Sequence, residues 1–187
     1  MAAAGIDAVA CDPLYDLPDA QLRDKHATSQ VLLRRLHKTS EPEDWLDQKH
    51  LDQQSAFEIC LADRDACPQH YLAAALPSLP FSSDHFDLVL SGHLLFSYAP
   101  IEEGGLMASG GFNLDWHQAA LLELCRVSRM EVRIYPAHTY SLIAERHGYA
   151  QWLLKHLPPG WCGEFTTPRY FQGLIGCTDG LHLWRDR

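Results

Sequence analysis

One segment, LPFSSDHFDLVLSGHLLFSYA at positions 79–99, limits the folds open to this chain more than any other. Pro80 keeps its first residues out of a central strand, because proline lacks the amide hydrogen that a sheet needs. The run 86–91 is short and almost continuously apolar, which is typical of a parallel strand covered on both faces. It ends in small and polar side chains, and open α/β sheets bind ligands outside the carboxyl ends of their strands. We therefore expect the segment 91–96 to lie at a binding site.

Strand and helix patterns alternate along the rest of the chain. The expected strands are 6–11, 70–75, 86–91, 131–135, 169–172 and 181–184, and the expected helices are 19–36, 43–61, a helix opened by Asp115 and Gln118 as a capping box, and 141–157. A glycine-bearing loop at 102–111 is expected to be flexible. This order predicts an α/β fold with a mainly parallel sheet, helices on both of its faces and a final antiparallel hairpin.

Length and composition are those of one globular domain over residues 1–187. The chain has 187 residues, a formal net charge of −9 and 47% hydrophobic residues. The negative charge argues against a broad nucleic-acid-binding surface. No apolar run approaches the roughly 20 residues of a membrane span, and the amino-terminal residues do not have the pattern of a signal peptide. We therefore expect a cytoplasmic protein with neither a nucleic-acid nor a membrane partner.

The six cysteines form no CxxC pair, which is typical of reduced thiols in a cytosolic protein. The spacings of metal-ligand motifs are also absent, so no metal site is expected.

Several blocks of the sequence carry a resemblance to a known family. LPFSSDHFDLVLSGHLLF at 79–96 resembles the segment around the fourth strand of class I S-adenosylmethionine-dependent methyltransferases. Ala8 to Asp12 resembles that family's second strand, and Glu-Leu-Cys-Arg-Val at 123–127 resembles the end of the helix before its fifth strand. The resemblance implies a Rossmann-like methyltransferase sheet in which 131–135 is the fifth strand and 169–185 forms strands six and seven. It implies S-adenosyl-L-methionine as the cofactor.

The resemblance also implies the cofactor-binding residues. The carboxylate of Asp12 would accept hydrogen bonds from the ribose hydroxyls of the cofactor. Residues 71–81 correspond to the third strand and the loop that touches adenine, which places Ala75 and Leu76 at the base. Ala75 stands where the family often has an acidic residue, so this contact departs from the pattern. The pocket would be completed by the residues at the end of the central strand, which are Ser91, Gly92 and His93.

The glycine-rich loop of the family is missing, because no GxG occurs in the sequence. The candidate second strand begins almost at Met1, so the first strand and its loop have no sequence to occupy, and we expect a sheet that lacks its usual first strand. Two explanations stay open. In the first, which we favour because a missing central strand leaves an exposed edge, the native protein has more residues upstream. In the second, the chain is complete and the candidate second strand pairs directly with the fourth. The genomic sequence upstream of Met1 decides between them.

Four residues are candidates for a direct chemical role. His93 follows the central strand, Tyr98 and His117 flank the glycine-bearing loop, and His138 follows the fifth strand. A histidine can act as a general base near neutral pH, but residues of this kind more often pack or hydrogen-bond to the backbone. Methyl transfer from a sulfonium depends mainly on placing the nucleophile and excluding water. The absence of a base motif is therefore compatible with this chemistry.

The sequence thus predicts an S-adenosylmethionine-dependent methyltransferase that acts on a small-molecule acceptor. The alternative is a non-catalytic methyltransferase-like protein, or a fragment of one, that binds a partner through its incomplete sheet. A nucleotide-dependent oxidoreductase is disfavoured because no GxGxxG occurs. The acceptor and the oligomeric state are not specified by the sequence.

Overall fold

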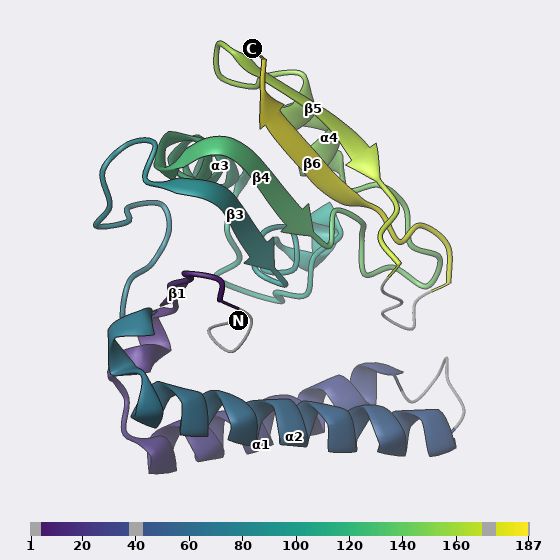
Figure 1. Ribbon diagram of the computed structural model, residues 1–187. Coiled ribbons are helices and arrows are strands. Elements are labelled where there is room, and N and C mark those ends of the chain that lie inside the picture. The colour runs from purple at the N-terminus through teal and green to yellow at the C-terminus, as the bar shows by residue number, and fades with distance from the viewer. Residues whose placement is uncertain (1–4, 38–42, 170–174, 187) are drawn as a thin grey trace. The chain divides into compact units, whose positions relative to one another are not determined.

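The computed structural model of the protein describes residues 5–37, 43–169 and 175–186 (Figure 1). The chain forms two compact units, Met1–Ala75 and Leu76–Arg187, which we call the N-terminal and C-terminal units. The expectation of a single methyltransferase-like domain stays a prediction. Among the described residues, no helix has the length and apolar character needed to cross a membrane.

The N-terminal unit combines a helical hairpin with a very small sheet. Its elements are β1 (Ala10–Cys11), η2 (Pro13–Asp16), α1 (Asp19–His37), α2 (Glu43–Ala66), η3 (Pro68–His70) and β2 (Tyr71–Leu72). Strands β1 and β2 pair in parallel, and the amide of Asp12 extends the pairing by donating to the carbonyl of Leu72 at 3.2 Å. The strands expected at 6–11 and 70–75 are therefore present but reduced to two residues each. The candidate second strand, β1, thus pairs with β2, the counterpart of the expected strand at 70–75.

Polar contacts join the two long helices of the hairpin. Gln30 hydrogen-bonds to His50 at 3.0 Å, and the ring of His26 stacks on Phe57 with centroids 4.1 Å apart. At the base of the hairpin, Arg64 pairs with Asp19 and donates to the carbonyl of Leu17 at 3.3 Å. Polar side chains thus contribute contacts between the described parts of the two helices.

The C-terminal unit contains a four-stranded mixed sheet. Its elements are β3 (Phe86–Gly92), η4 (Ile101–Glu103), α3 (Leu114–Val127), β4 (Ser128–Tyr135), α4 (Gly148–Leu154), β5 (Trp161–Thr166) and β6 (Gly180–Arg185). The strand order is β3-β4-β6-β5, with β3 parallel to β4 and β6 antiparallel to both of its neighbours. The α/β class and the final antiparallel hairpin are confirmed. The sheet is mixed rather than mainly parallel, because β6 runs antiparallel to both β4 and β5.

Alternating residues of the sheet face the two helices of this unit. Val132 and Ile134 of β4 and Leu183 of β6 are at most 1% exposed, and they pack with Leu121 of α3 and Leu153 of α4 in one apolar cluster. Both helices therefore cover the same face of the sheet (Figure 1). This apolar cluster is the core that supports the ends of β3 and β4.

The face of β3 that points away from α3 and α4 is exposed, whereas the sequence predicts that both faces are buried. Leu88 and Leu90 are 45% and 58% exposed, whereas Val89 and Ser91 point toward the packed side. The expectation of a strand buried on both faces is wrong for β3. An unbroken apolar run cannot distinguish one buried face from two, because it lacks the polar alternation that would mark an open face.

Most of the expected elements of this unit are confirmed, with three corrections. Helix α3 is capped by Asn113, whose side chain accepts from the amide of Trp116 at 2.9 Å, rather than by Asp115. The helix expected at 141–157 is confined to α4. Strand β5 was not predicted, and residues 170–172 of the strand expected at 169–172 lie outside the described part of the chain.

Candidate functional site

The carboxyl ends of β3 and β4 lie together, and two folded loops follow them. The amide of His93 donates to the carbonyl of Tyr135 at 2.6 Å, which joins the residue after β3 to the last residue of β4. The ring of His93 contacts the ring of Tyr135 edge-on, with centroids 5.5 Å apart. The sequence prediction that 91–96 follows the end of a parallel strand is therefore confirmed. The candidate site is the region at the carboxyl ends of β3 and β4.

Three of the predicted cofactor-binding residues lie at the carboxyl end of β3. Ser91 is buried at 8% exposure, while Gly92 and His93 are exposed. A Cβ placed on Gly92 would have no atom within 4 Å. There is therefore open space beside the end of β3, where a bound molecule can approach the backbone.

Asp12 and Ala75 follow the other parallel pair. Asp12 comes directly after β1 and residues 73–75 come after β2, so the parallel pairing places them beyond the same end of that pair. Leu76 is the first residue of the C-terminal unit, where it packs against the apolar cluster. The Asp12 carboxylate accepts from the amide of Leu14 at 2.8 Å and caps η2. It still has acceptor capacity for a hydroxyl group, since a carboxylate offers about four lone-pair sites.

The loop that follows β3 is folded rather than loose. The amide of Leu106 donates to Ser97, and the amide of Met107 donates to Ala99, at 3.0 and 3.2 Å. Gly105 approaches the carbonyl of Ala99 so closely that an added Cβ would lie 2.0 Å from that oxygen. The glycine at 105 permits these close backbone contacts, and the expected flexibility of the loop stays a prediction.

Two of the candidate catalytic residues differ in their exposure. Tyr98 is 45% exposed, and its ring stacks on Phe112 with centroids 6.1 Å apart. His117 is fully buried, and both of its ring nitrogens are hydrogen-bonded within the chain. In this conformation His117 has no nitrogen available to a substrate, whereas His93 and Tyr98 have access to solvent.

Three fully buried histidines lie in the loops and helix ends of this unit. They are His117 in α3, His138 after β4 and His147 at the start of α4. Nδ1 of His138 lies 3.0 Å from the carbonyl of Thr139, which marks it as the donor. Nδ1 of His147 accepts from the amide of Tyr149 at 3.1 Å, so its proton sits on Nε2. The Nε2 atoms of His138 and His147 are buried without a hydrogen-bond partner among the described residues.

Burial keeps these imidazoles neutral. Desolvation lowers the pKa of His117 and of His138 below the ordinary value of 6.5. Desolvation, together with the neighbouring His117 and His138, lowers the pKa of His147 to about 4. His147 was not among the residues predicted from the sequence. The signal that marks it is its position before Gly148 as a helix N-cap, a role in which histidine is uncommon.

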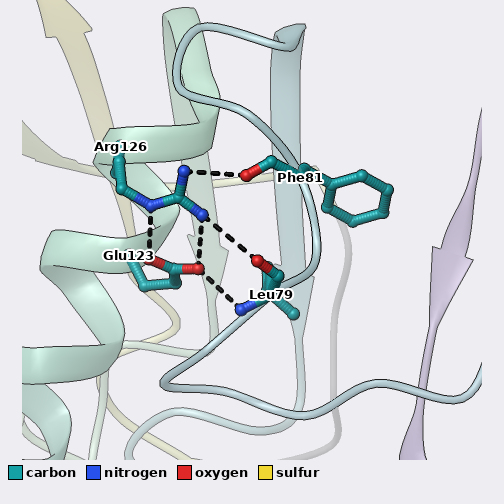
Figure 2. A network of polar contacts seen from close by, with 4 residues as sticks. All are labelled: Leu79, Phe81, Glu123 and Arg126. Carbon is teal, nitrogen blue, oxygen red and sulfur yellow. Dashed lines mark hydrogen bonds and ion pairs between the residues drawn. The ribbon is translucent and has the colours of Figure 1, made fainter.

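A polar network connects the segment before β3 to helix α3 (Figure 2). The carboxylate of Glu123 accepts from the amide of Leu79 at 2.6 Å and from Arg126 at 2.7 Å. The guanidinium of Arg126 donates to the carbonyls of Phe81 and Leu79, at 2.8 and 3.2 Å. Its charge lowers the pKa of the Glu123 carboxyl, chiefly through the hydrogen bonds between the two side chains.

Among the described residues, no group of three or more His, Cys, Asp or Glu side chains is placed to hold a metal. The carboxyl ends of β3 and β4 offer open space beside Gly92, exposed aromatic and imidazole rings, and backbone groups.

Comparisons with family models, with curated proteins and with solved structures found no match for this chain.

Proposed function

We propose that this chain is an S-adenosylmethionine-dependent methyltransferase that acts on a small molecule. The observation that carries the proposal is the contact drawn in Figure 2. Glu123 and Arg126 belong to the Glu-Leu-Cys-Arg-Val block, and Leu79 and Phe81 begin the Leu-Pro-Phe block. Two blocks that resemble the same family, far apart in the sequence, thus bind each other directly.

The topology of the C-terminal unit adds support. The counterparts of the family's fourth and fifth strands, β3 and β4, are adjacent and parallel, and an antiparallel pair completes the sheet. The counterparts of the second and third strands, β1 and β2, pair in parallel in the N-terminal unit. These are the pairings expected from a Rossmann-like sheet whose first strand is missing.

The residues that would contact the cofactor follow these strands. Asp12 would bind the ribose, Ala75 and Leu76 would lie against adenine, and the backbone near Gly92 would face the methionine part. Catalysis would consist of holding the acceptor in line with the transferable methyl group and excluding water. His93 and Tyr98, which are exposed near the end of β3, are the side chains best placed to orient an acceptor.

Isothermal titration of the full chain with S-adenosylmethionine tests the proposal. A Gly92→Leu variant would place a side chain in the open space beside β3, where its Cβ meets no atom within 4 Å. We expect it to keep the wild-type circular dichroism spectrum and to lose cofactor binding. Gly148→Leu is the matched control, because a Cβ at Gly148 also meets no atom within 4 Å and Gly148 begins α4. Failure of the wild type to bind the cofactor would contradict the proposal.

A second candidate function is partner binding through β3. This strand stands at the end of the described sheet order, and Leu88 and Leu90 are 45% and 58% exposed on it. Edge strands of this kind accept an additional strand from another chain. Light scattering after gel filtration distinguishes the two functions. A folded, monodisperse monomer that binds S-adenosylmethionine argues against this candidate, and association abolished by Leu90→Lys supports it.

A further inference from the structure

Two residues in the turn after β3 adopt a left-handed backbone conformation. His93 has a φ of 54° and Phe96 a φ of 66°. Bulky residues with a Cβ rarely adopt this conformation, and it persists only where the surrounding structure holds it. Such residues cluster at binding sites, where strain is part of how a loop is shaped. The His93–Phe96 turn is therefore held in place by particular contacts.

His117 supplies the contact at one end of this turn. Its Nε2 atom accepts a hydrogen bond from the amide of Phe96 at 3.0 Å, and its ring lies nearly parallel to the Phe96 ring. Its Nδ1 atom is 2.8 Å from the carbonyl of Asn113, so Nδ1 carries the proton and Nε2 the lone pair. Phe96 and His117 are both completely buried, which leaves no water to replace this bond.

The bond to Phe96 exists only while His117 is neutral. Protonation of Nε2 would place an N–H group against the amide N–H of Phe96 and remove the acceptor from a buried donor. The titratable groups that face His117 from α4 are the imidazole of His147 and the hydroxyl of Tyr149, whose ring centroid lies 5.1 Å away. Neither stabilises a positive charge on His117, because both are neutral near pH 7.

We propose that His117 is a positioning residue which holds the His93–Phe96 turn in its binding conformation, so that ligand binding at this turn weakens when His117 is protonated. The inference rests on the proposed function for the identity of the ligand, S-adenosylmethionine. Desolvation favours the neutral imidazole and places the transition below the ordinary histidine pKa of 6.5.

The decisive variant is His117→Gln. The side-chain carbonyl of glutamine can accept from the amide of Phe96 and does not titrate. The carbonyl of Asn113 still accepts from the backbone amide of residue 117, a bond that is 3.1 Å long in the wild type. Titration calorimetry with S-adenosylmethionine would be run at several pH values from 7.5 to 5. We expect the wild-type affinity to fall about tenfold per pH unit below the transition. His117→Gln should stay within about twofold across the range.

Two further variants serve as controls. His156→Gln alters an exposed histidine at the end of α4 and should keep the wild-type pH profile. His117→Leu removes the acceptor and should bind weakly at every pH. His138 and His147 are present in both proteins, but His117 lowers the pKa of His147, so the calorimetric profiles are interpreted together with the Phe96 amide resonance described next, which reports on His117 directly. A wild-type profile in His117→Gln would overturn the proposal.

A second measurement needs no cofactor. In ¹⁵N-labelled protein, the amide resonance of Phe96 should shift with the protonation of His117 in the wild type and stay constant in His117→Gln. A Phe96 amide that ignores pH in the wild type overturns the positioning role, even if the cofactor binds. If no variant binds S-adenosylmethionine at pH 7.5, the proposed function fails, and the Phe96 resonance alone decides the role of His117.

Discussion

The two units of this chain are stabilised in different ways. In the C-terminal unit, side chains from both helices and from the sheet strands form one apolar cluster, and most of its members are at most 3% exposed. In the described part of the N-terminal unit, the buried apolar side chains are Leu22 and Leu61, and polar pairs such as Gln30–His50 join the helices. The difference leads us to expect that the long helices of the hairpin are less resistant to unfolding than the shorter helices α3 and α4. Burial of a shared apolar face is what makes helices resistant to unfolding.

The largest effect should come from truncating the apolar cluster. Leu153→Ala removes a completely buried side chain of α4 and should lower the free energy of unfolding by about 2–5 kcal/mol. Leu61→Ala, at a side chain 4% exposed in the hairpin, should have a smaller effect confined to the N-terminal unit. Native-state hydrogen exchange measures both. Equal loss of protection in the two units after either substitution would break the comparison, because it would mean that they unfold together.

Acid should weaken the C-terminal unit more than the hairpin. The folded pKa of His147 is lowered to about 4, so below the ordinary value of 6.5 the unfolded state binds more protons than the folded one. Stability is therefore fully present above pH 6.5 and is lost as the pH falls from there, by about 3 kcal/mol for His147 once pH 4 is reached. Burial also lowers the pKa of His26 in the hairpin, but its ring is only partly buried.

Urea unfolding at pH 7.5 and at pH 5 measures this loss. His147→Asn keeps an oxygen that can accept from the amide of Tyr149, since asparagine is a favourable N-cap, and it removes the titrating group. We expect the stability of this variant to depend less on pH than that of the wild type. A wild-type stability that is constant between these pH values would refute the burial of neutral imidazoles.

The smallest effect should come from the network around Glu123. Glu123→Gln keeps an oxygen for the amide of Leu79 but removes the charge that attracts Arg126, so the free energy of unfolding should fall by about 1 kcal/mol. The exposed pair Asp87–Arg129, with side chains 65% and 59% exposed, supplies the control. Asp87→Asn should cause no measurable change. If the two variants behave alike in thermal unfolding, the network in Figure 2 is no stronger than a surface ion pair.

Local patterns in the sequence identified much of this fold. The apolar residues of α3 and the alternation in β4 mark one buried face each, and Val132 and Ile134 are buried while Arg133 is exposed. These predictions succeed because the spacing of apolar residues reflects the geometry of a helix or a strand. The end of β3 was located in the same way, since polarity changes where the strand leaves the core.

Other features depend on tertiary contacts that spacing does not encode. The segment 141–147 has helical spacing, but His138 and Arg146 pair as an antiparallel bridge, and the chain becomes helical only at Gly148. The exposure of Leu88 and Leu90 depends on which faces are covered by helices. The role of His117 depends on Phe96, which is 21 residues away and is reached only in the folded chain.

The strand order β3-β4-β6-β5 has a consequence for how the chain reaches this structure. Pairing β3 with β4 requires the chain to close over the whole of α3, and pairing β4 with β6 requires it to close over α4 and β5. Closure over long segments is entropically costly before any contact forms, whereas the contacts of a helical hairpin are local. We therefore expect the sheet to form more slowly than the α1–α2 hairpin.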